Sequence, residues 1–233
     1  GFNNTVYYFP NGADSQWGLR QVMSTQDSAP PSPFGNVNVL TADLDFDKRI
    51  DIIQSVSSGG GVNYQIWFNL EQNRFSERLT TFNDSGYLFS ERGVQIADFN
   101  GDRVPDLARI GLDSVSVMAG LGYGRFAPAI TVPIPEGLDS FQRDSARLQD
   151  ITGDGLADLV VERATPGTLY YWINLGNYQF SPRKIITGLP SAIAPNAVVR
   201  WADMDGNGAT DLVYADSAAS SRLQMVNLGQ LLN

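Results

Sequence analysis

One acidic loop occurs four times along this chain of 233 residues, each time in the same sequence context. The segments that carry it align without gaps, and their first aspartates are 55, 52 and 53 residues apart. They are Ala42–Ile53 (ADLDFDKRIDII), Ala97–Ala108 (ADFNGDRVPDLA), Gln149–Val160 (QDITGDGLADLV) and Ala202–Val213 (ADMDGNGATDLV). A period near fifty residues indicates one recurring structural unit, and such units bury a shared core by stacking on their neighbours.

Each repeat is predicted to contain four β-strands. In the first repeat an alternating apolar strand (36–43) enters the loop, and a second strand (51–56) leaves it. An aromatic-rich third strand (64–70) follows, and a fourth (77–82) comes after a turn. Period-two patterning with β-branched and aromatic residues favours strands over helices. The sequence therefore predicts an all-β chain that folds as a β-propeller of four-stranded blades.

A second feature recurs in phase with the loops. An apolar run ends in Asn or Gly, and an aromatic residue follows six positions later. The pairs are Asn11/Trp17, Asn69/Phe75, Gly120/Phe126 and Asn174/Phe180, and Asn227 stands where another pair would begin. Residues 27–35, 57–61 and 132–140 are predicted to be loops, and no helix is predicted.

The number of blades stays open at this point. The N-terminal residues supply only a third and a fourth strand, and the C-terminal residues supply a first, second and third strand. Either the two ends complete one blade, or the chain is part of a larger propeller. We therefore treat residues 1–233 as one propeller domain or propeller fragment, of four to five blades if it is complete.

Oxygen-bearing side chains occupy positions 1, 3, 5 and 9 of every loop, counted from its first aspartate. They are Asp43, Asp45, Asp47 and Asp51 in loop 1; Asp98, Asn100, Asp102 and Asp106 in loop 2; Asp150, Thr152, Asp154 and Asp158 in loop 3; and Asp203, Asp205, Asn207 and Asp211 in loop 4. Calcium takes about six to eight oxygen ligands, and backbone carbonyls often contribute. The position-7 carbonyls can therefore complete each ring, namely those of Arg49, Val104, Leu156 and Ala209.

The donor set selects the metal. The chain has no Cys and no His, so it offers none of the ligands that zinc and copper prefer. Magnesium prefers a smaller and largely hydrated octahedron, which leaves calcium as the better match. We expect about four calcium ions, one in each loop.

The acidic loops have two other interpretations. An EF-hand needs a glutamate at position 12 between two helices, but position 12 is Gln54, Arg109, Val161 and Tyr214, and the flanking segments are strands. A single loop could also be an acidic surface turn whose aspartates cap their own backbone. Four copies in register favour cation sites, as does the clustering of 13 of the 25 acidic residues in these loops.

Turn geometry distinguishes the loops. Glycine at positions 4 and 6 permits a positive φ at little steric cost. Loops 3 and 4 have glycine at both positions, whereas loop 1 has Phe46 and Lys48, and loop 2 has Arg103 at position 6. We expect strain or a modified turn in loops 1 and 2, and the best order in loops 3 and 4.

The loops also resemble a known family. The D-x-[DN]-x-[DN]-x-x-x-D pattern, with the LG-x-G-x-F turn at 121–126, resembles the FG-GAP/VCBS repeats of integrin α-chain propellers and their bacterial relatives. The resemblance covers nearly the whole chain and implies calcium ligands at positions 1, 3, 5 and 9. Residues 202–233 and YYWINLGNYQF (170–180) further resemble the propeller of the toxin-complex B-component/SpvB family and RHS-repeat proteins. That likeness implies a docking and gating element of a secreted toxin assembly.

Three classes of function remain. The first is a non-catalytic scaffold that docks to a protein partner or to the remainder of a larger parent chain. The alternative is a glycan-binding lectin or adhesin that uses exposed aromatic side chains. Its candidates are Trp17, Trp67, Trp172, Trp201 and Tyr170–Tyr171, although their strand positions favour core packing.

The third class is an enzyme with a carboxylate pair, such as a glycosidase. Its acids would have to lie outside the loops, and they are scattered: Glu71, Glu77, Glu91, Glu136 and Glu162. The missing histidine also removes the usual general base. We expect no catalytic residues.

Charge and hydropathy limit the kinds of binding partner and the cellular location that the sequence allows. A net charge of −9 disfavours binding to nucleic acid or to an anionic membrane. No apolar stretch approaches the roughly 18 residues of a membrane-spanning helix, so no membrane insertion is expected. Weak calcium loops suit a compartment with millimolar calcium, which favours an extracellular or secreted protein.

Overall fold

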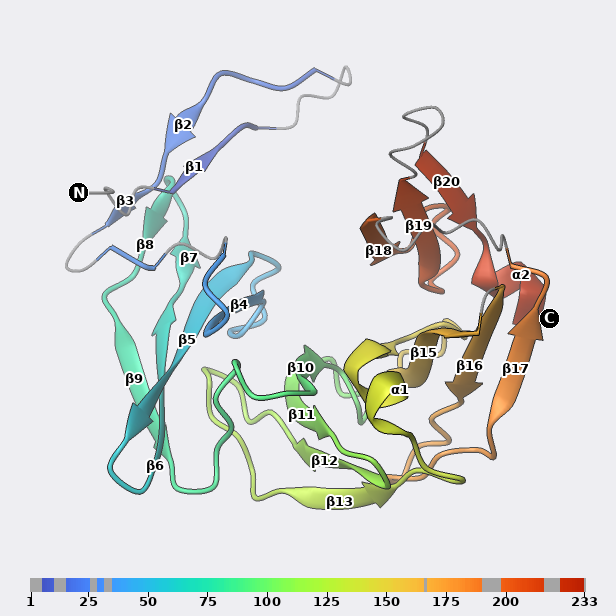
Figure 1. Cartoon of the computed structure of the whole chain (residues 1–233). Helices are drawn as coiled ribbons and strands as arrows, with labels where there is room; N and C mark the ends of the chain where they lie inside the picture. Colours follow the sequence, from blue (N-terminus) through green and yellow to red (C-terminus); the bar gives the residue numbers. More distant parts are fainter. Residues whose placement is uncertain are drawn as a thin grey trace. The chain divides into compact units, whose positions relative to one another are not determined.

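The computed structural model describes residues 6–10, 16–25, 29–31, 35–165, 167–189, 198–215 and 223–232 (Figure 1). It confirms the predicted class, a β-propeller built from four-stranded antiparallel sheets. The chain divides into two compact units. Unit 1 comprises Gly1–Val94 and Gly120–Pro128, and unit 2 comprises Gln95–Ala119 and Ala129–Asn233.

Unit 1 is built around one complete four-stranded sheet. Its strands follow the chain order: β4 (Val39–Ala42), β5 (Asp51–Ser58), β6 (Gly61–Trp67) and β9 (Leu79–Asn83). The predicted loop 57–61 shrinks to the two-residue turn Gly59–Gly60, because β5 and β6 continue pairing up to Ser58 and Gly61. Acidic loop 1 joins β4 to β5, which is the strand junction predicted for it.

Shorter pairings flank this sheet. β7 (Asn69–Leu70) pairs with β8 (Arg74–Phe75), β3 (Ser24–Thr25) pairs in parallel with β8, and β1 (Tyr7–Tyr8) pairs with β2 (Gln21–Val22). Asn69 lies opposite Phe75, as Gly120 lies opposite Phe126 and Asn174 opposite Phe180. The repeated Asn/aromatic pairs are therefore the two ends of one tight turn. Asn11 lies outside the described residues.

Unit 2 contains the remaining sheets, again in chain order (Figure 1). The first is β10 (Val94–Ala97), β11 (Asp106–Ile110), β12 (Ser114–Met118) and β13 (Ile130–Pro133). The second is β14 (Ala146–Gln149), β15 (Asp158–Thr165), β16 (Thr168–Trp172) and β17 (Lys184–Thr187). The third has three strands among the described residues: β18 (Val198–Ala202), β19 (Asp211–Ala215) and β20 (Leu223–Val226).

Consecutive sheets of unit 2 are joined by apolar clusters. One cluster contains Val117 and Val132 from the first sheet and Leu159 and Trp172 from the second. Another contains Val160 of the second sheet and Leu212 of the third. Because strand side chains alternate between faces, each sheet contributes one set of residues to each neighbour. This face-to-face burial is the stacking that the repeat predicts.

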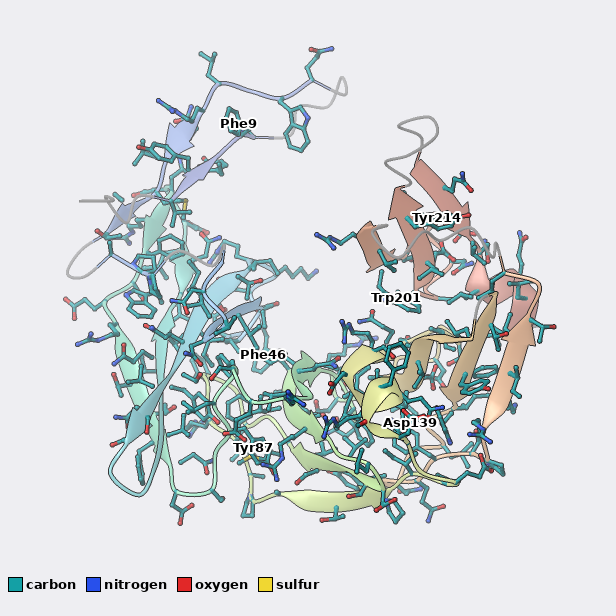
Figure 2. All side chains as sticks on the ribbon, viewed as in Figure 1. Phe9, Phe46, Tyr87, Asp139, Trp201 and Tyr214 are labelled. Carbon is teal, nitrogen blue, oxygen red and sulfur yellow. The ribbon has the colours of Figure 1, made fainter. Side chains whose placement is uncertain are left out.

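The prediction that the chain has no helix was wrong. α1 (Ser140–Ser145) begins in the segment predicted as the loop 132–140, which β13 also enters. A capping box starts this helix: the Asp139 side chain accepts from Gln142 N at 2.8 Å, and the Gln142 side chain accepts from Asp139 N at 3.0 Å (Figure 2). Six residues are too few for a helical period to appear in the sequence.

The second helix, α2 (Leu228–Leu232), follows a register that differs from the prediction. Leu228, and not Asn227, occupies the place held by Asn174 in the preceding sheet, because Leu228 N donates to Asp211 at 3.2 Å as Asn174 N donates to Asp158 at 2.8 Å. A one-residue offset exchanges the two faces of a strand. Leu228 is accordingly buried, while Met225 is 46 % exposed.

Within the described part of the chain, no helix is long and apolar enough to cross a membrane.

Candidate metal centres

The first aspartate organises every acidic loop. Its Oδ1 accepts a hydrogen bond from the position-4 N–H at 2.7–2.8 Å, and its Oδ2 accepts one from the position-6 N–H at 2.8–3.0 Å. These aspartates are Asp43, Asp98, Asp150 and Asp203. The same bonds in all four loops mean that the loops share one backbone conformation. They also confirm that the aspartates cap their own loop, as the surface-turn interpretation expects.

The ninth-position aspartates are fully buried. Asp51, Asp106, Asp158 and Asp211 have no exposed surface, and each is the first residue of the strand that leaves its loop. In every loop Oδ2 accepts from the position-2 N–H at 2.8–3.1 Å. Because a carboxylate oxygen has two lone pairs, these bonds leave capacity for a cation.

The side chain at position 5 accepts a hydrogen bond from the backbone two residues later in every loop. The Oδ1 atoms of Asp47, Asp102, Asp154 and Asn207 accept from the N–H at position 7 at 2.8–2.9 Å. The position-7 residues Arg49, Val104, Leu156 and Ala209 are therefore anchored within the loop. That their carbonyl oxygens face a cation stays a prediction.

Positions 1, 3 and 9 lie close together in loops 1, 3 and 4. In loop 1, oxygens of Asp43, Asp45 and Asp51 lie within 4.8 Å of one another, and in loop 4 those of Asp203, Asp205 and Asp211 do so. In loop 3, Thr152 Oγ1 lies 3.4 Å from Asp150 Oδ1 and 3.3 Å from Asp158 Oδ2. These contacts bring positions 1, 3 and 9 together.

In loop 2 the residue at position 3 is hydrogen-bonded to the residue at position 5. Asn100 donates from Nδ2 to Asp102 Oδ2 at 3.0 Å and accepts from Asp102 N at 2.9 Å. Asn207 in loop 4 also donates to an acidic neighbour, Asp205, at 3.1 Å. Asparagine at these two positions thus supplies an N–H₂ group that pairs with one of the clustered carboxylates.

Loop 1 carries an oxygen that lacks a partner. Asp45 Oδ1 is buried and has no hydrogen bond, and burial together with the Asp47 charge raises the pKa of Asp45 above its usual value. An unpaired buried oxygen is costly unless a cation or donor reaches it. Asp47 in the same loop forms an ion pair with Arg49, whose Nε also donates to Asn69 O at 2.6 Å.

Burial raises the pKa of two ninth-position carboxyl groups when no metal is bound. It raises the pKa of Asp51 from 3.8 to about 6 and that of Asp158 from 3.8 to about 7. Acidic neighbours in the same loop add to both shifts, and backbone N–H donors oppose them. A bound divalent cation would favour the charged forms of both groups.

The backbone angles agree with the predicted strain. Phe46, Lys48 and Arg103 have φ values of 68°, 70° and 67°, at positions where loops 3 and 4 have glycine with φ between 77° and 90°. The three non-glycine residues therefore adopt the left-handed conformation, which costs side-chain-bearing residues roughly 1–2 kcal/mol. Loops 1 and 2 keep the shared loop shape at this cost.

Sequence reasoning missed two residues that hold the ninth-position aspartates. Asn69 N donates to Asp51 Oδ1 and Asn174 N donates to Asp158 Oδ1, both at 2.8 Å. Asn174 is 1 % exposed, and its Nδ2 also donates to Phe99 O at 2.8 Å and Ala157 O at 3.1 Å. The in-phase recurrence of asparagine after the third strand was the available signal.

The aromatic residues considered for a glycan-binding surface differ in their burial. Trp67, Trp172 and Tyr171 are buried in the core, and Tyr170 and Trp201 are partly buried against it. The expectation of core packing was wrong for Trp17, which is 73 % exposed. In sequence it lies between β1 and β2, which pair as a two-stranded sheet among the described residues.

Two of the acids outside the loops are engaged with neighbouring groups. Glu136 forms an ion pair with Arg183 at 3.3 Å, and Glu91 accepts from Leu88 N at 2.9 Å. The side chain of Glu162 lies outside the described residues. The described clusters of three or more acidic ligands are those of loops 1 and 4.

Comparison with known families identifies the repeat. A model described as the FG-GAP-like repeat matches residues 98–161 and 150–214, which together are half of the 233 residues. The chain belongs to the FG-GAP-like repeat family. No curated protein sequence matches it.

Solved structures show the same fold. A Photorhabdus luminescens Tc holotoxin pore has a TM-score of 0.67 at 18 % identity, over 97 % of this chain and 11 % of that one. An Agrocybe aegerita lectin specific for non-reducing terminal N-acetylglucosamine has a TM-score of 0.59 at 22 % identity, over 97 % of this chain and 58 % of that one. A TcdB2–TccC3–Cdc42 structure has a TM-score of 0.54 at 15 % identity, over 98 % and 13 %. This FG-GAP chain thus spans about a tenth of the toxin chains and somewhat over half of the lectin.

Proposed function

We propose that this FG-GAP-repeat chain is a non-catalytic, calcium-stabilised β-propeller scaffold that docks to another protein or to the rest of its own parent chain. The observation that carries the calcium part is the identical backbone conformation of four loops, each with a buried aspartate at position 9. Burying a charged carboxylate is unfavourable without a compensating charge. Calcium would provide that charge in each of the four loops.

The residues present fit calcium. The side chains predicted to bind the metal all offer oxygen atoms as ligands. One of these atoms, Asp45 Oδ1, is buried and has no hydrogen-bond partner. The side chains at positions 1, 3, 5 and 9 would hold the ion together with the position-7 carbonyl. The ion would neutralise the clustered carboxylates and tie the strand that enters each loop to the strand that leaves it. Four ions would change the net charge of −9 to about −1.

Calcium removal tests this part of the proposal. Each occupied site should stabilise the folded chain by roughly 3 kcal/mol at a few hundred times its dissociation constant. At about 2 °C per kcal/mol, one site alone would raise the melting temperature by about 6 °C. Isothermal calorimetry should count about four ions. No calcium uptake, together with a melting temperature unchanged by EDTA, would refute the calcium sites.

The docking part rests on an exposed apolar surface at the N-terminal segment of unit 1. Tyr7, Phe9, Trp17, Leu19 and Val22 are 48–86 % exposed and lie within sixteen residues of sequence. Figure 2 labels Phe9 in this segment. A cluster of large apolar side chains is typical of a protein interface. A two-stranded pairing such as β1–β2 is also only marginally stable on its own. The likeness to Tc toxin chains supports a partner within a secreted toxin-type assembly, and hence an extracellular location.

Hydrogen exchange would test the docking surface. Residues 6–10 and 16–25 should exchange slowly in the product of the complete gene and quickly in the 233-residue chain alone, because docking would cover them. Equal exchange in both would contradict docking to the rest of the parent chain. A partner protein would then have to restore protection, and failure of both would overturn the scaffold role.

Glycan binding is the second candidate function. A cavity of about 570 Å³ in unit 1 is lined by Tyr7, Arg49, Asn69, Glu71 and Asn73, among others. That volume falls in the range of small-molecule sites, and an aromatic ring beside amide and charged groups suits a sugar. A glycan array read with Asn73→Ala and Glu71→Ala would test it. Binding lost in both variants would favour a lectin, and an array without hits would exclude one.

A further inference from the structure

We propose that loops 2, 3 and 4 do not bind calcium independently, but are coupled through a relay of main-chain hydrogen bonds from each loop to the one before it. The inference rests on the proposed calcium sites, and all three loops belong to unit 2. The relay uses position 8, a residue with no side-chain role in the predicted site.

The relay from loop 3 to loop 2 passes through two peptide groups. Ala157 N, at position 8 of loop 3, donates to the carbonyl oxygen of Asp98 at 2.9 Å. This N–H shares its peptide group with the Leu156 carbonyl, the predicted position-7 ligand of loop 3. The Asp98 carbonyl in turn shares its peptide group with Phe99 N, which donates to Asp106 Oδ2 at 2.8 Å. A ligand of loop 3 is thus connected to a ligand of loop 2.

Loops 4 and 3 are connected in the same way. Thr210 N, at position 8 of loop 4, donates to the carbonyl oxygen of Asp150 at 2.7 Å. Its peptide group contains the carbonyl of Ala209, the predicted position-7 ligand. The Asp150 carbonyl that accepts this bond shares its own peptide group with Ile151 N, which donates to Asp158 Oδ2 at 3.1 Å. Two consecutive links therefore form one chain of contacts from loop 4 through loop 3 to loop 2.

Packing between the loops supports the relay. A Cβ added at Gly153, position 4 of loop 3, would lie 3.2 Å from Ala209 N in loop 4. A Cβ added at Gly101, position 4 of loop 2, would lie 2.9 Å from Leu156 Cδ2 in loop 3. Asn174 adds a second link, because its Nδ2 bridges the carbonyls of Phe99 in loop 2 and Ala157 in loop 3. Consecutive loops therefore cannot move separately without breaking hydrogen bonds or contacts.

The sequence also determines where such a relay ends. Position 8 of loop 2 is Pro105, which has no backbone N–H and cannot donate this bond to any loop. Pro105 further shows that the loop conformation accepts proline at position 8. Replacing the residue at this position by proline is therefore a substitution that removes the donor at a site where the repeat already tolerates the ring.

Two effects of opposite sign contribute to the coupling. An ion in one loop lowers the negative charge near the next loop and so weakens calcium binding there, an effect that about 0.15 M salt reduces among the carboxylates that face solvent. Ordering one loop also fixes the peptide groups that position the ligands of its neighbour, so the second ion meets a preorganised site. Hydrogen-bonded links are not screened by salt. We expect positive cooperativity among loops 2, 3 and 4.

A double-mutant cycle on the whole chain tests this coupling with calcium as the only ligand. The amide resonances of Gly155 and Gly208 report occupancy of loops 3 and 4 separately in an NMR titration at 0.15 M KCl. Asp205→Asn should weaken loop 4 and raise the calcium midpoint at Gly155 by about fivefold, the low end of coupling between protein sites. In a Thr210→Pro background the same substitution should change the Gly155 midpoint less than twofold. Thr210→Ala, which keeps the N–H, should behave as the wild type.

The outcomes separate the two proposals. If Asp205→Asn shifts the Gly155 midpoint equally with and without Thr210→Pro, or shifts it to lower calcium, the relay is wrong although the calcium sites stand. If neither glycine responds to calcium in the wild-type chain, the proposed calcium function fails first. Should Thr210→Pro not fold, Ala157→Pro read at Gly101 and Gly155 tests the link between loops 3 and 2, where a reduced coupling is expected because the Asn174 side chain still joins the two loops.

Discussion

At the scale of single residues, Asn174 shows how much a position outside the predicted ligand set can contribute. It is fully enclosed, and its backbone and side chain make three hydrogen bonds that reach two different loops. Its counterpart Asn69 makes the same backbone bond but has a single side-chain bond of 3.3 Å, to Ile50 O. Comparing Asn69 with Asn174 therefore distinguishes the bond that this asparagine makes within its own loop from the bonds that link two loops.

Asn174→Ala should lower the free energy of unfolding by roughly 2–4 kcal/mol, because two buried carbonyl oxygens lose their donor and a cavity forms. Asn69→Ala should cost about 1 kcal/mol, since its side-chain bond is longer and lies at the surface. Urea denaturation of both variants in saturating calcium measures the difference. Equal losses would mean that the bonds between loops contribute nothing.

Backbone conformation at position 6 gives a second residue-scale prediction. Gly155 has a φ of 87° and open space around its missing Cβ, so Gly155→Ala probes the backbone angle alone. We expect it to cost about 1 kcal/mol, and Arg103→Gly at the same position of loop 2 to gain a similar amount. Thermal unfolding of the metal-free chain measures both. A stabilising Gly155→Ala would show that the left-handed conformation carries no strain here.

At the scale of elements, the sequence predicted what repeats and missed what occurs once. Strands, loops and ligand positions recur four times, so each copy supports the others against local ambiguity. α1 occurs once, and its evidence is confined to the Asp139–Gln142 capping box. The Asn227 register also failed, because the NLG motif at 227–229 matches the one at 174–176 in letters while the last sheet aligns one residue later. Similarity of motif does not specify register where the following turn differs.

The last sheet offers a direct test of that register. Leu228 is buried without exposed surface, so Leu228→Ala should cost about 2–4 kcal/mol. Met225→Ala removes a similar volume from a half-exposed side chain and should cost less than about 1 kcal/mol. Chemical denaturation of the two variants decides between the registers. The reverse order of losses would place Asn227 at the end of the third strand, as the motif predicts.

At the scale of the whole molecule, the proposed calcium sites would make folding, calcium binding and pH one linked equilibrium. The oxygen-bearing side chains at positions 1, 3, 5 and 9 were identifiable from the sequence because they recur in all four loops. Their burial was not, because an aspartate that begins a strand looks the same in sequence whether it is exposed or enclosed. Burial nevertheless determines how the metal-free chain responds to pH.

In the metal-free chain the pKa of Asp158 rises from 3.8 to about 7 on folding, and that of Asp51 to about 6. A folded state that holds protons more tightly is favoured at low pH. This contribution to stability is therefore complete below about pH 3.8 and is lost as the pH rises through about 6 and 7. Calcium at the proposed sites would reverse the trend, because the ion requires the charged carboxylates and so would bind more tightly as the pH rises.

Asp158→Asn isolates this effect, because the amide has the shape of the protonated acid and does not titrate. In EDTA, the stability of the variant relative to wild type should rise by roughly 2–4 kcal/mol between pH 5 and pH 8, as the wild-type carboxyl loses its proton in a buried site. In saturating calcium the order should reverse, with the variant less stable at pH 8 because loop 3 lacks a charged ligand. Urea denaturation at both pH values, with and without calcium, gives the four differences. A relative stability that depends on pH but not on calcium would show that Asp158 is a buried acid that binds no ion, and one that depends on neither would also contradict its raised pKa.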